Sequence, residues 1–85
     1  MAEQVRAYQR TLTPEIRRAM KAAILALPRG DTKPLNDELE GLHRLRVGNH
    51  RIIFRHRAGQ IECFLAASRS IIYEFLSAHL REFLG

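Results

Sequence analysis

The sequence predicts a small α+β fold, in which helices pack on a mostly antiparallel sheet, and three segments support this prediction. A helix-start signal at Thr13-Pro14 precedes apolar residues at helical spacing. The run LHRLRVGNHRIIFRH, residues 42–56, alternates around a Gly48-Asn49 turn as β-hairpins do. The closing run SRSIIYEFLSAHLREFLG again spaces its apolar residues as a helix does. The predicted order is strand, helix, loop with a short helical turn, three strands, helix.

Length and composition predict one folded domain over residues 1–85. Hydrophobic residues form 46% of the chain, which is enough for a core and argues against disorder. The 14 lysines and arginines exceed the 9 acidic residues, and the formal charge of +5 favours an anionic partner such as RNA, DNA or an acidic protein segment. With no signal-peptide core, no apolar stretch long enough for a bilayer and a single cysteine, we expect a cytoplasmic protein without a membrane partner.

The N-terminal half is expected to hold a strand, a helix and a loop. The strand, at Val5–Arg10, has only a weak pattern. Thr13 is the expected N-cap of the helix, Pro14 suits its first position, and Pro28 ends it. The stripe of apolar residues on this helix comprises Ile16, Met20, Ala23, Ile24 and Leu27. The following run RGDTKPLNDELEG is rich in turn formers and acids, so we expect a loop with one helical turn at Asp37–Glu40.

Three strands are expected at 42–47, 50–57 and 60–66, joined by two-residue turns. These turns place Arg46 opposite Arg51, and on the third strand they place Phe64 opposite Ile53. One face of the sheet is then apolar and carries Leu45, Val47, Ile52, Phe54, Ile61, Cys63 and Leu65. The other face carries Arg44, Arg46, Arg51, Arg55 and Arg57, with Ile53 and Phe64 between them. A slip of one residue would exchange the two faces.

Cations directly opposite each other on neighbouring strands destabilise a sheet, so the pairing of Arg46 with Arg51 needs an explanation. An anion bound between them would reverse the repulsion, which favours a phosphate-binding face. A solvated outer face is the alternative, and it suits Arg55 best because Glu62 lies opposite. The four histidines and Cys63 show no metal-ligand spacing, and we assign them structural roles. We expect no cofactor and no metal.

The segment LEGLHRLRVGNHRIIFRHRAGQIECFLAASRSIIYEFL resembles the second half of toxins of the RelE/ParE superfamily of type II toxin–antitoxin systems. The shared pattern is an arginine-bearing strand, a glycine turn, an arginine followed by aliphatic residues, and an arginine four residues before a tyrosine. Here these are RLRVGNHRIIF and RSIIY. The KPL loop and the TPEIRRAM helix also match, so the resemblance runs from about Val5 onward. AASR stands where the family usually has a GHR-like segment.

The resemblance implies the activity of the RelE branch, whose toxins cut messenger RNA in the ribosome through attack of a 2′-hydroxyl on the adjacent phosphate. The matching catalytic positions are Arg46, Arg51, Arg69 and Tyr73, with Tyr73 as general base. We expect Arg44 and Arg55 to bind RNA. In the family pattern, Arg44 and Arg46 match two cations on the same strand. The implied partners are a cognate antitoxin, the ribosome and mRNA.

Two alternatives remain open at this point. In the ParE branch the same fold inhibits DNA gyrase through protein–protein contact, and the arginine face would then be an interface. An inactive module that only binds an antitoxin is the second alternative.

Overall fold

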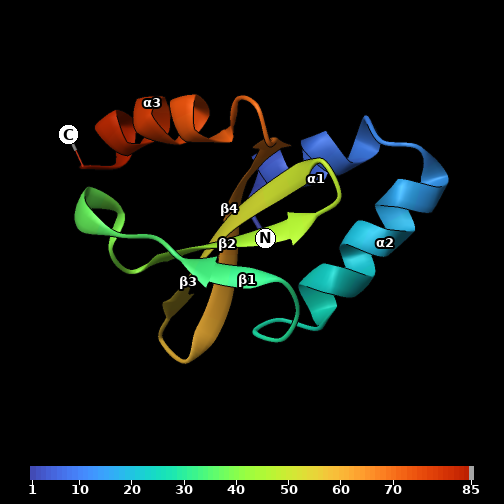
Figure 1. Ribbon diagram of the computed structural model, residues 1–85, viewed down its shortest axis with the longest axis horizontal. Helices are drawn as coiled ribbons and strands as arrows, with labels where there is room; N and C mark the ends of the chain where they lie inside the picture. Colours follow the sequence, from blue (N-terminus) through green and yellow to red (C-terminus); the bar gives the residue numbers. More distant parts are fainter. Residues whose placement is uncertain (85) are drawn as a thin grey trace.

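The computed structural model describes residues 1–84, and Figure 1 shows a sheet lying between α2 on one side and α3 on the other. The elements are α1 (Glu3–Arg10), α2 (Pro14–Leu25), β1 (Thr32–Pro34), the short 3-10 helix η1 (Asp37–Leu39), β2 (Leu42–Val47), β3 (His50–Arg57), β4 (Gln60–Ser68) and α3 (Ile72–Leu84). The sheet is antiparallel throughout, with the order β1-β2-β3-β4. Within residues 1–84, no helix combines the length and apolar character needed to cross a membrane.

The α+β class is confirmed, but the predicted N-terminal strand is wrong, because these residues form helix α1. Val5 and Gln9 are buried one helical turn apart, which places one face of a helix against the sheet. The exposed side of α1 carries ion pairs from Glu3 to Arg6 and Arg10. An isolated helix of eight residues with few apolar side chains is not stable, so its contacts with the sheet decide its conformation.

The free edge of β4 is covered by the N-terminal segment. The Gln4 side-chain amide donates to the Ala66 carbonyl and accepts from the Ala66 N–H, both at 2.7 Å. The Ala2 N–H donates to the Cys63 carbonyl at 3.0 Å. One side-chain amide therefore takes the place that a peptide group of a neighbouring strand would occupy.

Replacing Gln4 by alanine is expected to lower the free energy of unfolding by about 1–3 kcal/mol, because two backbone groups of the fully buried Ala66 lose their partners. In a domain of this size, that corresponds to a fall in Tm of at least about 5 °C. Thermal and urea unfolding measure the effect. Gln60→Ala is the matched control, since Gln60 is exposed at the start of β4, and a similar loss there would contradict the explanation.

Helix α2 begins as predicted, with Thr13 at the N-cap and Pro14 at the first helical position. The Thr13 side chain makes no capping hydrogen bond, whereas its carbonyl accepts from the Arg17 N–H at 2.9 Å. The Arg17 guanidinium in turn donates to the carbonyls of Gln9 and Leu12, which fixes the turn between α1 and α2. Along the α2 stripe, Met20 is fully buried.

The β2–β3 hairpin has the predicted strands, turn and register. Gly48 occupies the first central position of the turn with φ of 58°, a conformation that glycine adopts without strain. Arg46 lies opposite Arg51, and Leu45 lies opposite Ile52. Leu45 and Ile52 are buried, so the apolar face of this hairpin is confirmed.

The predicted register between β3 and β4 is correct only up to the pairing of Phe54 with Cys63. A β-bulge follows, so that Ile53 pairs with Leu65 instead of the expected Phe64. Leu65 consequently packs with Ile53 and Phe64, on the opposite face to the one predicted, and Ala66 takes its place beside Ile52.

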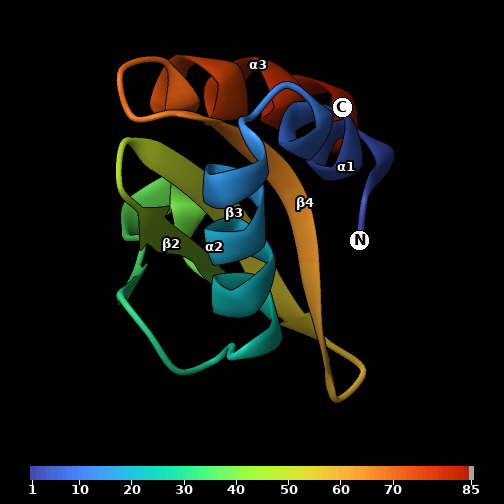
Figure 2. The ribbon, with the colours of Figure 1, turned by 90° about the vertical axis from the view of Figure 1, so that its right-hand side faces the viewer.

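Two apolar clusters lie on the two faces of the sheet. The cluster under α1 and α2 comprises Val5, Met20, Leu45, Ile52, Phe54, Cys63 and Ala66. The cluster under α3 comprises Ile53, Phe64, Leu65, Ala67, Ile72 and Leu76. Figure 2 shows α2 against one face of the sheet and α3 across its upper end. The arginine face is therefore partly covered by α3, which places the start of α3 next to the arginines.

Candidate phosphate-binding site

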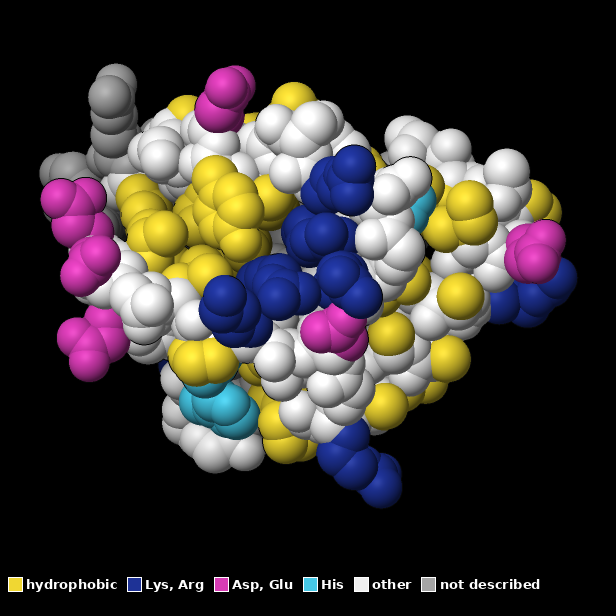
Figure 3. All heavy atoms as spheres, in the orientation of Figure 1, with side chains coloured by type: hydrophobic (Ala, Val, Ile, Leu, Met, Phe, Trp, Pro, Cys, Tyr) yellow, Lys and Arg dark blue, Asp and Glu magenta, His cyan; other side chains and the backbone are white. Residues whose placement is uncertain are grey.

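An open depression of about 320 Å³ lies on the α3 side of the sheet, where five of the six predicted site residues meet. It is lined by Arg44, Arg46, Arg51, Arg69, Ser70 and Tyr73. We call this feature the arginine depression. Figure 3 shows basic side chains gathered in the middle of this face, with an acidic side chain against them.

These side chains come from three segments of the chain, which are β2, β3 and the turn that begins α3. Arg44 and Arg46 lie on β2, and Arg51 lies directly opposite Arg46 on β3. The Arg69 N–H donates to the Asn49 carbonyl at 2.8 Å, so the turn that begins α3 is attached to the β2–β3 turn. The Arg51 guanidinium donates to the Gly48 and His50 carbonyls at 2.8 and 3.0 Å, which holds it over the same turn.

Asp31 balances part of this positive charge. Its carboxylate lies 2.7 Å from Nε of Arg46 and 3.7 Å from Nη1 of Arg44. The Nη1 group of Arg44 is buried and has no hydrogen-bond partner among the described residues. The other two arginines of the depression, Arg51 and Arg69, have no ion pair with any described carboxylate. The site therefore keeps an excess of positive charge and unused donors.

The pKa of Arg51 responds to burial and to this excess of positive charge. Desolvation lowers the pKa of the Arg51 guanidinium below its ordinary value. Nearby positive charges lower it further, and they belong to Arg44, Arg46 and Arg69. Tyr73 acts in the opposite direction. Because like charges crowd one another here, a bound anion would relieve a repulsion that the folded protein otherwise carries.

Tyr73 projects from the first turn of α3 and is 48% exposed. Its hydroxyl makes no hydrogen bond to another described residue, so it is available to a ligand in the arginine depression. The turn residues Arg69 and Ser70 precede it on the same rim. Oriented guanidinium groups can bind a phosphodiester, and a phenol oxygen beside them can accept a proton from a neighbouring hydroxyl group.

Arg55, expected to bind RNA, lies outside the lining of the depression. It pairs with Glu62 at 3.0 Å, as the register predicts, and its guanidinium carbon lies 5.6 Å from the centre of the Phe64 ring. Arg57, at the same end of β3, is 3.7 Å from Glu62. The two arginines at this end of the arginine face therefore form ion pairs with Glu62, and they lie outside the depression.

The other polar side chains of interest lie on the opposite face of the sheet. The Tyr8 hydroxyl and His50 Nδ1 are 2.7 Å apart, and burial raises the pKa of this tyrosine. His43 stacks on Phe54, with ring centroids 5.2 Å apart. Burial also raises the pKa of the Cys63 thiol, which disfavours the nucleophilic thiolate.

Sequence reasoning missed two members of the site, Asp31 and Ser70. Asp31 directly precedes β1, a three-residue edge strand that ends in Pro34 and was expected to be loop. The pairing of β1 with β2 brings Asp31 beside Arg46, whose N–H donates to the Asp31 carbonyl at 2.9 Å. Ser70 lies between the two predicted residues Arg69 and Tyr73 in the sequence, and this position could have indicated that it belongs to the site.

Comparison with protein-family models and with curated proteins found no match for this chain. Among solved structures, the fold is similar to a chain in the crystal structure of the RelB-RelE antitoxin-toxin complex from Methanococcus jannaschii. The TM-score is 0.61 and the sequence identity is 22%, and the match covers 75% of this chain and 82% of that chain. At this identity the likeness shows that the two chains share a fold.

Proposed function

We propose that this protein is a RelE-like toxin of a type II toxin–antitoxin system, which cleaves messenger RNA on the ribosome. The observation that carries the proposal is the arginine depression, in which the predicted catalytic residues Arg46, Arg51, Arg69 and Tyr73 meet. The shared fold with the RelB-RelE complex supports it. The register and the α3 turn bring these residues together from three segments, so their meeting does not depend on one local motif.

The chemistry follows from the depression's charge and its free phenol. Guanidinium groups bind the oxygens of a phosphodiester and stabilise the charge that gathers in the transition state. As general base, the Tyr73 oxygen accepts the proton of the 2′-hydroxyl, whose oxygen then attacks the neighbouring phosphorus. The bond from phosphorus to the 5′-oxygen breaks, and the 5′-oxygen takes a proton from water. The products are a 2′,3′-cyclic phosphate and a 5′-hydroxyl.

The same comparison supports an antitoxin partner, because the similar fold occurs in an antitoxin–toxin complex. The excess of positive charge at the depression favours a partner segment with acidic side chains. Such a segment would cover the depression and keep RNA out.

Incubating the protein with programmed ribosomes is expected to give message fragments that end in a cyclic phosphate and begin with a 5′-hydroxyl. Mapping of RNA ends measures this, and a supercoiling assay of DNA gyrase is run alongside. Inhibited gyrase with intact messages would replace the proposal by the ParE-like function. Intact messages with active gyrase, together with antitoxin binding, would reduce the protein to a binding module.

A further inference from the structure

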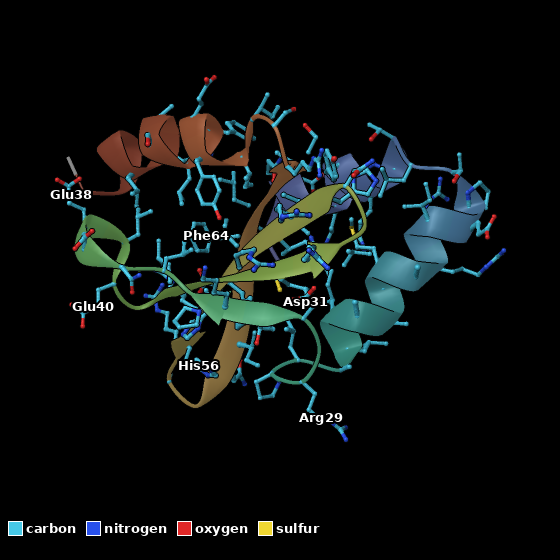
Figure 4. All side chains as sticks on the ribbon, in the orientation of Figure 1. Arg29, Asp31, Glu38, Glu40, His56 and Phe64 are labelled. Atoms are coloured by element: carbon cyan, nitrogen blue, oxygen red, sulfur yellow. The ribbon has the colours of Figure 1, made fainter. Side chains whose placement is uncertain are left out.

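Both the backbone and the side chain of Asp31 contact β2. The Arg46 N–H donates to the Asp31 carbonyl, while Nε of the same arginine contacts the Asp31 carboxylate at 2.7 Å. The carboxylate also approaches Nη1 of Arg44, at 3.7 Å. Figure 4 places Asp31 at the centre of the molecule, beside β1, away from the acidic residues Glu38 and Glu40 at the far end of the view.

The Asp31 carboxylate lies against two arginines of the depression, where a bound anion would also find positive charge. It contacts two of the four lining arginines and lies 2.7 Å from Nε of Arg46, a donor that a phosphate oxygen could use. The Asp31 side chain is 49% exposed and that of Arg46 is 56% exposed. An ion pair this exposed contributes little stability, so a phosphodiester that contacts more of the four lining arginines can displace it.

We propose that Asp31 is an internal competitor, which occupies the arginines until a phosphodiester of single-stranded nucleic acid displaces it. The inference rests on the proposed binding of phosphate in the arginine depression. Competition of this kind lowers affinity for any single phosphate, because each ligand must replace the carboxylate. It sets a threshold that favours ligands held in place by further contacts and disfavours free mononucleotides and short oligomers.

The alternative role for Asp31 is to position Arg46 for its ligand. The two roles predict opposite results for removal of the side chain. If Asp31 competes, its loss frees Nε of Arg46 and strengthens phosphate binding. If Asp31 positions, its loss lets the Arg46 side chain move and weakens binding. Asparagine keeps an oxygen that can accept from Nε but carries no charge, so it separates the two effects.

The test is the affinity of the full chain for a fluorescein-labelled single-stranded DNA hexamer, which lacks the attacking 2′-hydroxyl and is not cut. Asp31→Asn is expected to bind about tenfold more tightly at low salt, because a negative charge near the bound phosphate is removed. Asp31→Ala should bind at least as tightly as wild type. Both gains should shrink at high salt. Fluorescence anisotropy measures all of these.

Glu38→Gln is the matched control, because Glu38 is exposed on η1 and its replacement changes the net charge by the same amount. It should change the affinity less than twofold. A gain in Glu38→Gln equal to that in Asp31→Asn would reduce the effect to net charge and overturn the proposal. Weaker binding by Asp31→Ala, or an unchanged affinity in both Asp31 variants, would also overturn it.

Arg51→Ala separates this inference from the proposed function. If Arg51→Ala weakens hexamer binding while the Asp31 variants bind like wild type, phosphate binding stands and only the competition is wrong. If Arg51→Ala binds like wild type, the arginine depression is not the phosphate site, and both proposals fall. Tighter binding by Asp31→Asn without any message cleavage would keep the competition and reject the nuclease.

Discussion

Tyr73→Phe is expected to lower the rate of ribosome-dependent message cleavage by about 10²–10⁴-fold, the usual cost of losing a general base. The phenol of Tyr73 lies in the arginine depression, and its hydroxyl has no hydrogen-bond partner among the side chains that the structure describes. The substitution removes only that oxygen and keeps the ring. The free energy of unfolding should therefore change by less than about 0.5 kcal/mol, and antitoxin binding should persist. Single-turnover cleavage and thermal unfolding measure the two effects.

Tyr8→Phe is the matched control, because it removes the same atom on the opposite face of the sheet. The Tyr8 hydroxyl lies 2.7 Å from His50 Nδ1, so its loss should cost about 1 kcal/mol of stability. Cleavage should stay at the wild-type rate. The two variants thus have opposite profiles, one losing activity and the other losing stability. Wild-type cleavage by Tyr73→Phe would reject Tyr73 as the base.

The centre of the sheet could be predicted from local pattern alone. A two-residue turn at Gly48 fixes one register, and alternation then assigns every side chain of β2 and β3 to a face. The errors arise where local pattern carries no information. The bulge beside Phe54 inserts a residue without any Gly or Pro signal, and it moves Leu65 to the other face. Helix α1 takes its conformation from contacts with β4 that are distant in sequence, such as the pairing of Gln4 with Ala66.

The contacts of the candidate site also fall into those that local pattern predicts and those that it does not. The pairing of Arg46 with Arg51 follows from the hairpin, and the pairing of Arg55 with Glu62 follows from the next turn. The link between Arg69 and the β2–β3 turn is a backbone hydrogen bond between distant segments, which only the family resemblance could indicate. The contact of Asp31 with the arginines could be recognised only in the three-dimensional structure, because an acidic residue in a loop of turn formers can have many other roles.

Arg51→Ala is expected to lower the cleavage rate by on the order of 10²-fold or more, comparable with the loss of one donor that stabilises a transition-state charge. Its effect on stability should be small, less than about 1 kcal/mol. Arg51 loses an exposed hydrogen bond to the Gly48 carbonyl and a partly buried one to the His50 carbonyl, but the repulsion from Arg46 disappears as well. Desolvation and the neighbouring positive charges both lower the pKa of Arg51, which agrees with this balance.

Two further variants decide what Arg51 contributes. Arg57→Ala removes an exposed arginine from the same strand, outside the arginine depression, and should cleave at the wild-type rate. Arg51→Lys keeps the charge but lacks the planar fork that meets two phosphate oxygens, so it should restore only part of the activity. Cleavage rates and urea unfolding of the three variants give the answer. Full activity of Arg51→Ala would reject a catalytic role for Arg51. A stability loss of several kcal/mol would show that Arg51 supports the fold, which it can do without contacting the scissile phosphate.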